Sequence, residues 1–196
     1  LHRFNTSEFT ALRRKAYLLL GFVFITACSG AFVAGLDAGE AFNTFPLMDG
    51  KLIPDGLFDL VPLYINFFEN SITVQFSHRV LALVTAILIV LFWFGIQRHR
   101  IPKSTALPIH CLLIAVISQV GLGISTLLLF VPLTLAIAHQ TVSVMLFICA
   151  VWLARELTPP AIVADVSSVE ESGVNTFDAT TRLKQLKPAR FNWIAD

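Results

Sequence analysis

Residues 74–97 read VQFSHRVLALVTAILIVLFWFGIQ, and this stretch decides the fold. It exceeds the ~20 apolar residues with which a helix crosses a bilayer. Three further apolar stretches lie at 16–36, 104–130 and 133–154, and Arg79 is the only charged residue in all four. An unpaired charge at mid-bilayer costs at least ~2.5–3.5 kcal/mol, so this segregation is typical of a membrane bundle. The sequence therefore predicts an all-α membrane protein with four transmembrane helices.

The composition agrees with a membrane protein and excludes several other classes. Of 196 residues, 56% are apolar and 14% are charged, and the mean hydropathy is +0.75. Soluble domains average about 45–50% apolar and about 25% charged residues. The balance excludes a disordered chain, a coiled coil and a nucleic-acid-binding module with a basic face, and it argues against an ordinary soluble enzyme. We therefore expect the lipid bilayer as a partner, and no nucleic acid.

The charges outside the apolar stretches predict an orientation. Twelve of the 14 basic residues lie before the first helix, in the link 98–103, or at and after the end of the fourth helix. The loop 37–73 instead carries one basic residue against six acidic ones. The positive-inside rule places both termini and the link on the inner side, and the loop on the outer side. We expect an inner-side leader at 1–15, a membrane domain at 16–155 whose outer loop contains short interfacial helices, and a polar, flexible inner-side tail at 156–196.

Three of the five histidines lie inside predicted helices, and their depths differ. The second helix is expected to start near Thr73 and the fourth near Leu133, both at the outer side. His78 lies five residues into its helix and His139 six residues into its own. At 1.5 Å per residue, both imidazoles lie about 7–9 Å below the outer end. His110 belongs to the third helix, which enters from the inner side, so the depths pair His78 with His139 and leave His110 out.

A matched pair of histidines on two helices of a bundle suits the axial ligation of a haem iron, with one imidazole on each face of the porphyrin. A bare zinc or copper ion normally takes further ligands, and no Cys, Asp or Glu lies at that depth. In the alternative interpretation the two histidines are unrelated, and each bonds to a neighbouring backbone or hydroxyl group. The matched depth favours His78 and His139 as iron ligands.

Small residues lie at the same depth on the other two helices. They are Gly30 and Gly35 on the first helix, and Gly121 and Gly123 on the third. A flat macrocycle between helices needs such space, although close helix packing in membranes uses small residues as well. The match with the histidine depth favours a cofactor pocket. Arg79, which follows the first histidine of the pair, can extend to the interface or pair its guanidinium with a haem propionate.

Longer motifs surround these residues. They are GAFVAGLDAG at 30–39 with NTFP at 43–46, VQFSHR at 74–79, QVGLGISTL at 119–127 and AHQ at 138–140. Together they resemble the haem A synthase family, in its mitochondrial and alphaproteobacterial type. The resemblance covers roughly residues 16–155, which include all four predicted helices.

The resemblance implies a function. Family members have two similar four-helix halves, and this chain resembles the C-terminal half, in which a haem b lies between two histidines that fall on His78 and His139. The N-terminal half binds the substrate haem O, and a Glu one turn before its first histidine is implicated in oxidising a methyl group to the formyl group of haem A. Gln75 stands at the equivalent place here, and an amide cannot act as an acid or base. The resemblance thus implies the cofactor and electron-transfer half of an oxidoreductase in haem A biosynthesis and cytochrome c oxidase assembly, without a catalytic residue of its own.

The same resemblance implies partners and a location. The chain needs an N-terminal four-helix half, on the same or another chain, and we expect it to be inactive without one. An electron donor is also implied, and a homo-oligomer stays open. We expect the mitochondrial inner membrane, with the bacterial inner membrane as the alternative, and both termini on the matrix or cytoplasmic side. Two other functions stay open, a stand-alone four-helix b-type cytochrome and an assembly subunit without haem, but the motif at 37–46 favours the enzyme because a generic cytochrome has no reason to carry it.

Overall fold

The computed structural model describes residues 6–97 and 103–158, with side chains from residue 9 in the first range and from 105 in the second. Within these ranges the chain forms helices and no β-strand, although an isolated bridge joins Met48 and Lys51. The elements in order are α1 (Thr6–Gly35), η1 (Ala38–Glu40), η2 (Leu63–Ile65), α2 (Asn66–Glu69), α3 (Ser71–Ile96), α4 (Lys103–Leu128) and α5 (Leu133–Glu156). The predicted all-α class is confirmed.

Four of these helices are long and apolar enough to cross a membrane. The segments that qualify are Phe9–Gly35, Ser71–Ile96, Thr105–Leu128 and Leu133–Glu156. Only 11–22% of the most apolar part of each segment is buried inside the protein. Large apolar side chains such as Leu18, Ile114 and Ile148 are instead exposed on the outside. Such an apolar exterior needs lipid as its solvent, so the predicted membrane bundle is confirmed.

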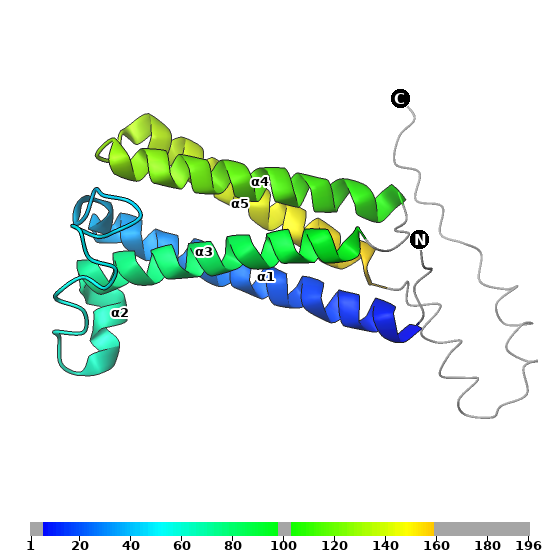
Figure 1. The fold of residues 1–196 in the computed structure, drawn as a ribbon, viewed down its shortest axis with the longest axis horizontal. Helices are drawn as coiled ribbons and strands as arrows, with labels where there is room; N and C mark the ends of the chain where they lie inside the picture. Colours follow the sequence, from blue (N-terminus) through cyan, green and yellow to red (C-terminus); the bar gives the residue numbers. More distant parts are fainter. Residues whose placement is uncertain (1–5, 98–102, 159–196) are drawn as a thin grey trace, which may run out of the picture. The chain divides into compact units, whose positions relative to one another are not determined.

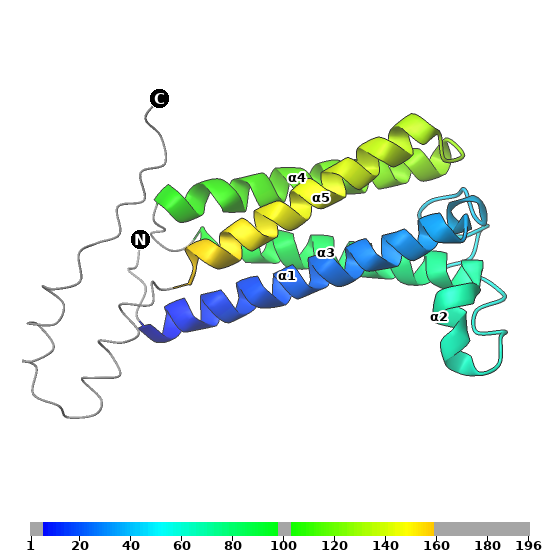
Figure 2. The same ribbon diagram turned by 180° about the vertical axis from the view of Figure 1, so that it is seen from behind.

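The long helices form a bundle of two pairs. α1 packs along α3, and α4 packs along α5. Contacts of α1 with α5 and of α3 with α4 close the bundle. The two pairs converge toward the end at which α1 begins and diverge toward the end at which α5 begins (Figures 1 and 2). We refer to these as the converging end and the diverging end.

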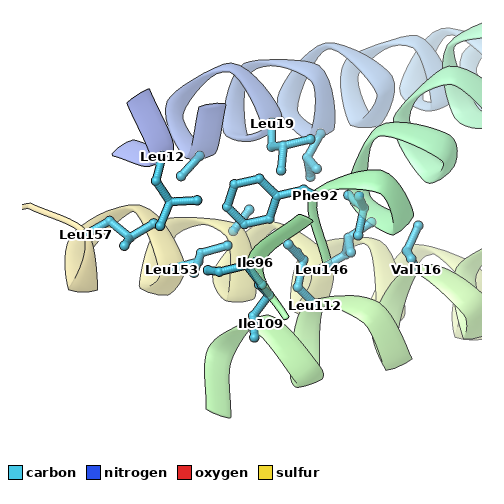
Figure 3. Packing of buried hydrophobic residues seen from close by; sticks show 14 residues of the cluster. Leu12, Leu19, Phe92, Ile96, Ile109, Leu112, Val116, Leu146, Leu153 and Leu157 are labelled. Carbon is cyan, nitrogen blue, oxygen red and sulfur yellow. The ribbon is translucent and has the colours of Figure 1, made fainter. Parts of the chain in front are cut away.

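The apolar core lies at the converging end. Ten of its buried side chains, from all four long helices, are labelled in Figure 3: Leu12, Leu19, Phe92, Ile96, Ile109, Leu112, Val116, Leu146, Leu153 and Leu157. Toward the diverging end, no residue of the described range 117–145 is fully buried. The buried residues of α3 at that end include the polar Thr73 and Gln75. Apolar packing therefore joins the helices at one end, and polar side chains lie inside the other.

The beginning of α1 differs from the prediction. The helix starts at Thr6, so residues 6–15 of the expected leader are helical rather than a separate segment. Leu12 belongs to the buried core, which explains why the helix extends beyond the apolar stretch 16–36. Hydropathy marks the part of a helix that suits lipid, and packing decides where the helix begins. The other long helices begin and end within three residues of their predicted bounds.

Two parts of the predicted organisation remain predictions. Residues 1–5, 98–102 and 159–196 lie outside the described part of the chain. The inner-side tail and most of the link between the second and third helices fall on these residues. The orientation in the membrane remains a prediction as well.

The connection between α1 and α3 contains the short helices η1, η2 and α2. The side chain of Asn66 is buried and organises its second half, because Nδ2 donates to the carbonyl oxygens of Leu60 at 2.7 Å and Leu63 at 3.0 Å. Oδ1 of the same residue accepts from the amide of Leu60 at 2.9 Å. Asn70 then caps α3, since its Oδ1 accepts from the amide of Thr73 at 3.2 Å. That these short helices lie in the membrane interface stays a prediction.

Candidate functional site

The structure brings His78 and His139 to the same end of the bundle. His78 lies seven residues after the start of α3, and His139 six residues after the start of α5. Both helices begin at the diverging end (Figure 1), so the two imidazoles lie about 9–11 Å below it at 1.5 Å per residue. They share one level, as their depths in the sequence predicted.

His110 lies at the converging end. Its ring packs edge-to-face against Trp93 of α3, with the ring centroids 6.2 Å apart. Its Nδ1 lies 2.6 Å from the carbonyl oxygen of Ala106, one turn earlier in α4. These contacts keep His110 apart from the pair formed by His78 and His139.

The His78 ring lies against α1. A methyl group on Gly30 would come within 3.1 Å of Cε1 of His78, so the glycine allows the close approach. Nδ1 of His78 is 2.8 Å from Oγ of Ser29, which in turn donates to the carbonyl oxygen of Thr26 at 2.7 Å. One turn deeper in α1 and two turns deeper in α3, Oγ1 of Thr26 and Oγ1 of Thr85 join the same two helices at 2.8 Å. α1 therefore holds the ring through a glycine and a hydrogen bond.

The His139 ring lies against α4 in a similar way. A methyl group on Gly123 would come within 2.9 Å of Cε1 of His139, closer than side-chain atoms normally approach. Nε2 of His139 is 3.2 Å from Nε2 of Gln119. Nδ1 of His139, Oε1 of Gln119 and Oγ1 of Thr126 are buried and have no hydrogen-bond partner among the described residues. Because such atoms are costly to bury, three of them on α4 and α5 point to a further polar or metal group at this end.

Two of the four glycines expected to line a pocket do not contact a histidine. A side chain at Gly35 or Gly121 would meet nothing within 4 Å. Gly121 precedes Gly123 by two residues, and a helix turns by about 200° over that distance, so the two face opposite ways. Gly35 follows Gly30 by five residues and is rotated by about 140° from it. Only Gly30 and Gly123 lie beside the histidine rings.

Arg79 and Gln75 hold the loop that follows α1. Nη1 of Arg79 donates to the carbonyl oxygen of Thr44 at 2.9 Å, and Nη2 donates to that of Phe42 at 2.7 Å. Nε2 of Gln75, which is buried, donates to the carbonyl oxygens of Phe42 at 3.1 Å and Gly39 at 3.3 Å. Nε of Arg79 is buried and has no partner in the described part of the chain. Arg79 therefore orders the loop at the histidine end, a role that the sequence did not suggest.

Asn43 joins the same loop to α4. Its Nδ2 donates to the carbonyl oxygen of Leu127 at 2.9 Å and to that of Gly39 at 3.2 Å. Gly39 also lies against the side chain of Val131, since a methyl group there would come within 3.2 Å of Cγ2. The loop 37–46 thus connects the α1–α3 pair with the α4–α5 pair at the diverging end.

The contacts of Ser29 and Gln119 with the histidines, and of Asn43 with α4, were not predicted from the sequence, although Gln119 was expected to form a hydrogen bond within the bundle. Ser29 directly precedes Gly30, and Gln119 lies one turn before Gly123. A polar residue beside each glycine that contacts a histidine is a signal that could have identified the first two. Asn43 lies in an irregular loop, where spacing carries no such signal.

The set of possible metal ligands is small. No group of three or more His, Cys, Asp or Glu side chains that could hold a metal ion occurs in the described residues. A zinc site of the usual kind, with three or four protein ligands, therefore has no ligand set in this part of the chain. Two imidazoles at one level of a bundle suit an iron whose other ligands come from a macrocycle.

The whole described bundle corresponds to a known protein family. The family model COX15-CtaA, described as a cytochrome oxidase assembly protein, matches residues 3–151. The chain belongs to this family. The COX15-CtaA match includes both histidines of the pair, the loop 37–46, α1, α3 and α4, and most of α5. The resemblance inferred from the sequence motifs is confirmed, and the chain is an integral membrane member of the COX15-CtaA family.

Individual members of the COX15-CtaA family are similar to the chain over its helices. The "Heme A synthase" of Nitrosomonas eutropha is 49% identical over 147 residues, which are 75% of this chain and 41% of the relative. The "Heme A synthase COX15" of Bos taurus is 47% identical over 153 residues, or 78% of this chain and 37% of the relative. The "Heme A synthase" of Parvibaculum lavamentivorans is 39% identical over 153 residues, or 78% and 43%. The chain thus spans 37–43% of the length of these relatives. No solved structure matches it.

Proposed function

We propose that this chain is the haem-binding half of a haem A synthase and that it holds a haem b between His78 and His139. The observation that carries the proposal is the matched pair of imidazoles, each lying against a glycine of the neighbouring helix. The buried, unpartnered polar atoms of His139 and Gln119 fit a further group at this level. When bound, the haem would supply one-electron transfer at the site.

The proposed reaction of the complete enzyme oxidises a methyl group of haem O to the formyl group of haem A. Gln75 stands where the substrate half of the family has a Glu, and here its amide donates to two loop carbonyl oxygens. An amide cannot exchange a proton as a carboxyl group does. We therefore assign this chain to electron transfer and not to the oxidation itself, so that no catalytic residue lies in it. The substrate haem O would bind to an N-terminal four-helix half, for which the matched relatives are long enough.

Arg79 keeps hydrogen-bond donors for a haem propionate. A guanidinium has five N–H groups, and the loop carbonyls of Phe42 and Thr44 take two of them. We propose that Arg79 contacts both the loop and a propionate, and that Gly30 and Gly123 provide the room beside the two rings. Gly35 and Gly121 have open space beside them and contact neither histidine, so we assign them no role at the two rings.

The proposed location is the mitochondrial inner membrane, with the bacterial inner membrane as the alternative. The distribution of basic residues favours both termini on the matrix or cytoplasmic side. The apolar exterior of the bundle fits lipid and an N-terminal half as neighbours. We further expect an electron donor and no activity of the chain without the other half, and a homo-oligomer is compatible with the same exterior.

Optical spectra of the purified protein test the haem. Reduced-minus-oxidised spectra of the wild type should show sharp b-type bands. His78→Ala and His139→Ala should abolish low-spin haem, whereas His110→Ala, whose ring packs at the converging end, should keep it. No b-type bands in the wild type, or an equal loss in all three variants, would refute the proposed ligands.

The haem A content of cells separates the enzyme from a stand-alone b-type cytochrome. Haems are extracted from strains with and without this gene and separated by chromatography. Loss of haem A without the gene supports a haem A synthase, and unchanged haem A with a b-type spectrum supports the cytochrome. The loop 37–46 favours the enzyme, because a generic cytochrome has no reason to carry its motif. Three side chains hold this loop at the histidine end: Gln75, Arg79 and Asn43.

A further inference from the structure

The hydrogen bonds of Ser29 determine which nitrogen of His78 carries the hydrogen. A serine hydroxyl has a single hydrogen, and Ser29 donates it to the carbonyl oxygen of Thr26 at 2.7 Å. At its 2.8 Å contact with His78, Oγ of Ser29 can then only accept, so Nδ1 of His78 is the donor. Neutral His78 therefore has its hydrogen on Nδ1 and a free lone pair on Nε2.

A free lone pair on Nε2 is what a metal needs from this ring. Histidines that bind metals usually donate their other N–H to a fixed acceptor, which sets the tautomer, orients the ring and makes the ligand more basic. Ser29 and Thr26 form such an acceptor chain within α1. Gly30, the next residue, lies against the ring and limits its movement toward α1.

His139 is held at the opposite nitrogen. The contact at 3.2 Å joins its Nε2 to the amide nitrogen of Gln119, which can only donate. Nε2 of His139 therefore accepts, and its ring hydrogen lies on Nδ1. That Nδ1 is buried and has no partner among the described residues. The lone pair that a metal would need on Nε2 is therefore engaged by Gln119.

We propose that Ser29 is a positioning residue that fixes His78 with Nε2 free for the iron, whereas Gln119 competes with the iron for Nε2 of His139. His78 is then the firmly held axial ligand and His139 the exchangeable one. This inference rests on the proposed function, because it takes both histidines as iron ligands. The two ligands differ, and Ser29 and Gln119 are the residues that make them differ.

Ser29→Ala tests the first part in the full chain, purified and loaded with haem b. Loss of a hydrogen-bond partner of a metal ligand typically lowers metal affinity about 10–100-fold, and we expect haem affinity to fall by that factor. The midpoint potential should become more positive, because a less basic ligand stabilises ferric iron less. Each tenfold loss of ferric relative to ferrous affinity shifts it by about 59 mV.

Two matched variants separate positioning from packing. Ser29→Thr keeps the hydroxyl group and should restore both the affinity and the midpoint potential. Thr141→Val removes an exposed hydroxyl two residues after His139, one that donates to the carbonyl oxygen of Ile137 in its own helix. It should change neither quantity. A defect of Ser29→Ala that Ser29→Thr does not rescue would overturn the positioning role.

Gln119→Leu tests the second part. Removing the competing donor should raise the affinity of the haem-free protein for haem b by up to about tenfold, the equivalent of one hydrogen bond. Lower affinity in this variant would overturn the competition. A wild type without b-type haem would instead refute the proposed function. A wild type with low-spin haem, together with a Ser29→Ala variant of unchanged affinity and potential, would overturn this inference alone.

Discussion

Gly123→Ala tests the contact on which the His139 ring rests. The added methyl carbon would lie 2.9 Å from Cε1 of His139, whereas ordinary van der Waals contact begins at 3.4 Å. The ring therefore has to move by about 0.5 Å, while metal–ligand distances in proteins hold to about ±0.2 Å. An imidazole displaced by this much would hold a haem iron less well than the wild-type ring.

The cost of this displacement should fall on haem binding more than on folding. Overpacking of this size costs about 1–3 kcal/mol. Replacing glycine by alanine in a helix interior returns about 1 kcal/mol, so the free energy of unfolding should fall by at most about 2 kcal/mol. Because 1.4 kcal/mol corresponds to a factor of ten, haem affinity should fall by roughly 5–100-fold.

Haem titration followed by absorbance, with the low-spin ferric signal in electron paramagnetic resonance, measures the effect. Gly121→Ala is the matched control, because it lies on the same helix and its methyl group would meet nothing within 4 Å. It should bind haem as the wild type does. Gly30→Ala, whose methyl group would lie 3.1 Å from the His78 ring, should have a smaller effect than Gly123→Ala. Equal affinity of the Gly121→Ala and Gly123→Ala variants would refute the reasoning.

Three further substitutions address the loop and the core. Arg79→Leu removes two charge-assisted hydrogen bonds to the loop 37–46, each worth about 1.5–3 kcal/mol. Limited proteolysis should therefore cleave this loop faster than in the wild type. An unchanged cleavage rate would contradict the role of Arg79. Asn66→Ala removes a buried side chain that bonds partly buried backbone groups of the loop, and it should lower the free energy of unfolding in detergent by about 1–3 kcal/mol, with an unchanged haem spectrum. Leu112→Ala opens a cavity in the core and should lower the free energy of unfolding by about 2–5 kcal/mol. The haem midpoint potential should not change, and an altered potential would contradict the separation of the two ends.

The membrane helices were predictable because the bilayer imposes both a length and a penalty on charge. These constraints acted on every residue of 74–97 except Arg79, so a single sequence revealed them. The start of α1 was not predictable in the same way, since Leu12 is held by packing against the other helices. The residues that flank the apolar stretches are placed by contacts within the protein. Hydropathy does not describe those contacts.

The depth of each site residue along its helix was predictable from the sequence, but the direction in which the residue faces around the helix axis was not. A constant rise per residue gave the common level of His78 and His139. The same depth argument selected Gly35 and Gly121, which face away from the rings, because it contains no rotation. The contacts of Arg79 depend on the path of the loop after α1. This loop begins with Asp37 in a left-handed conformation (φ 49°), and its backbone has no regular repeat from which a contact could be predicted.

The uneven packing of the bundle has a consequence for the order of assembly. The apolar cluster at the converging end contains only side chains of this chain, so it can form before any cofactor is present. Local unfolding is easiest where few apolar side chains are buried, and this describes the diverging end. A flat ligand can therefore enter between the α1–α3 pair and the α4–α5 pair during local openings, while the other end keeps the four helices together. Amide hydrogens around His139 should accordingly exchange faster than those around Leu153, and haem should slow the exchange of the first group only.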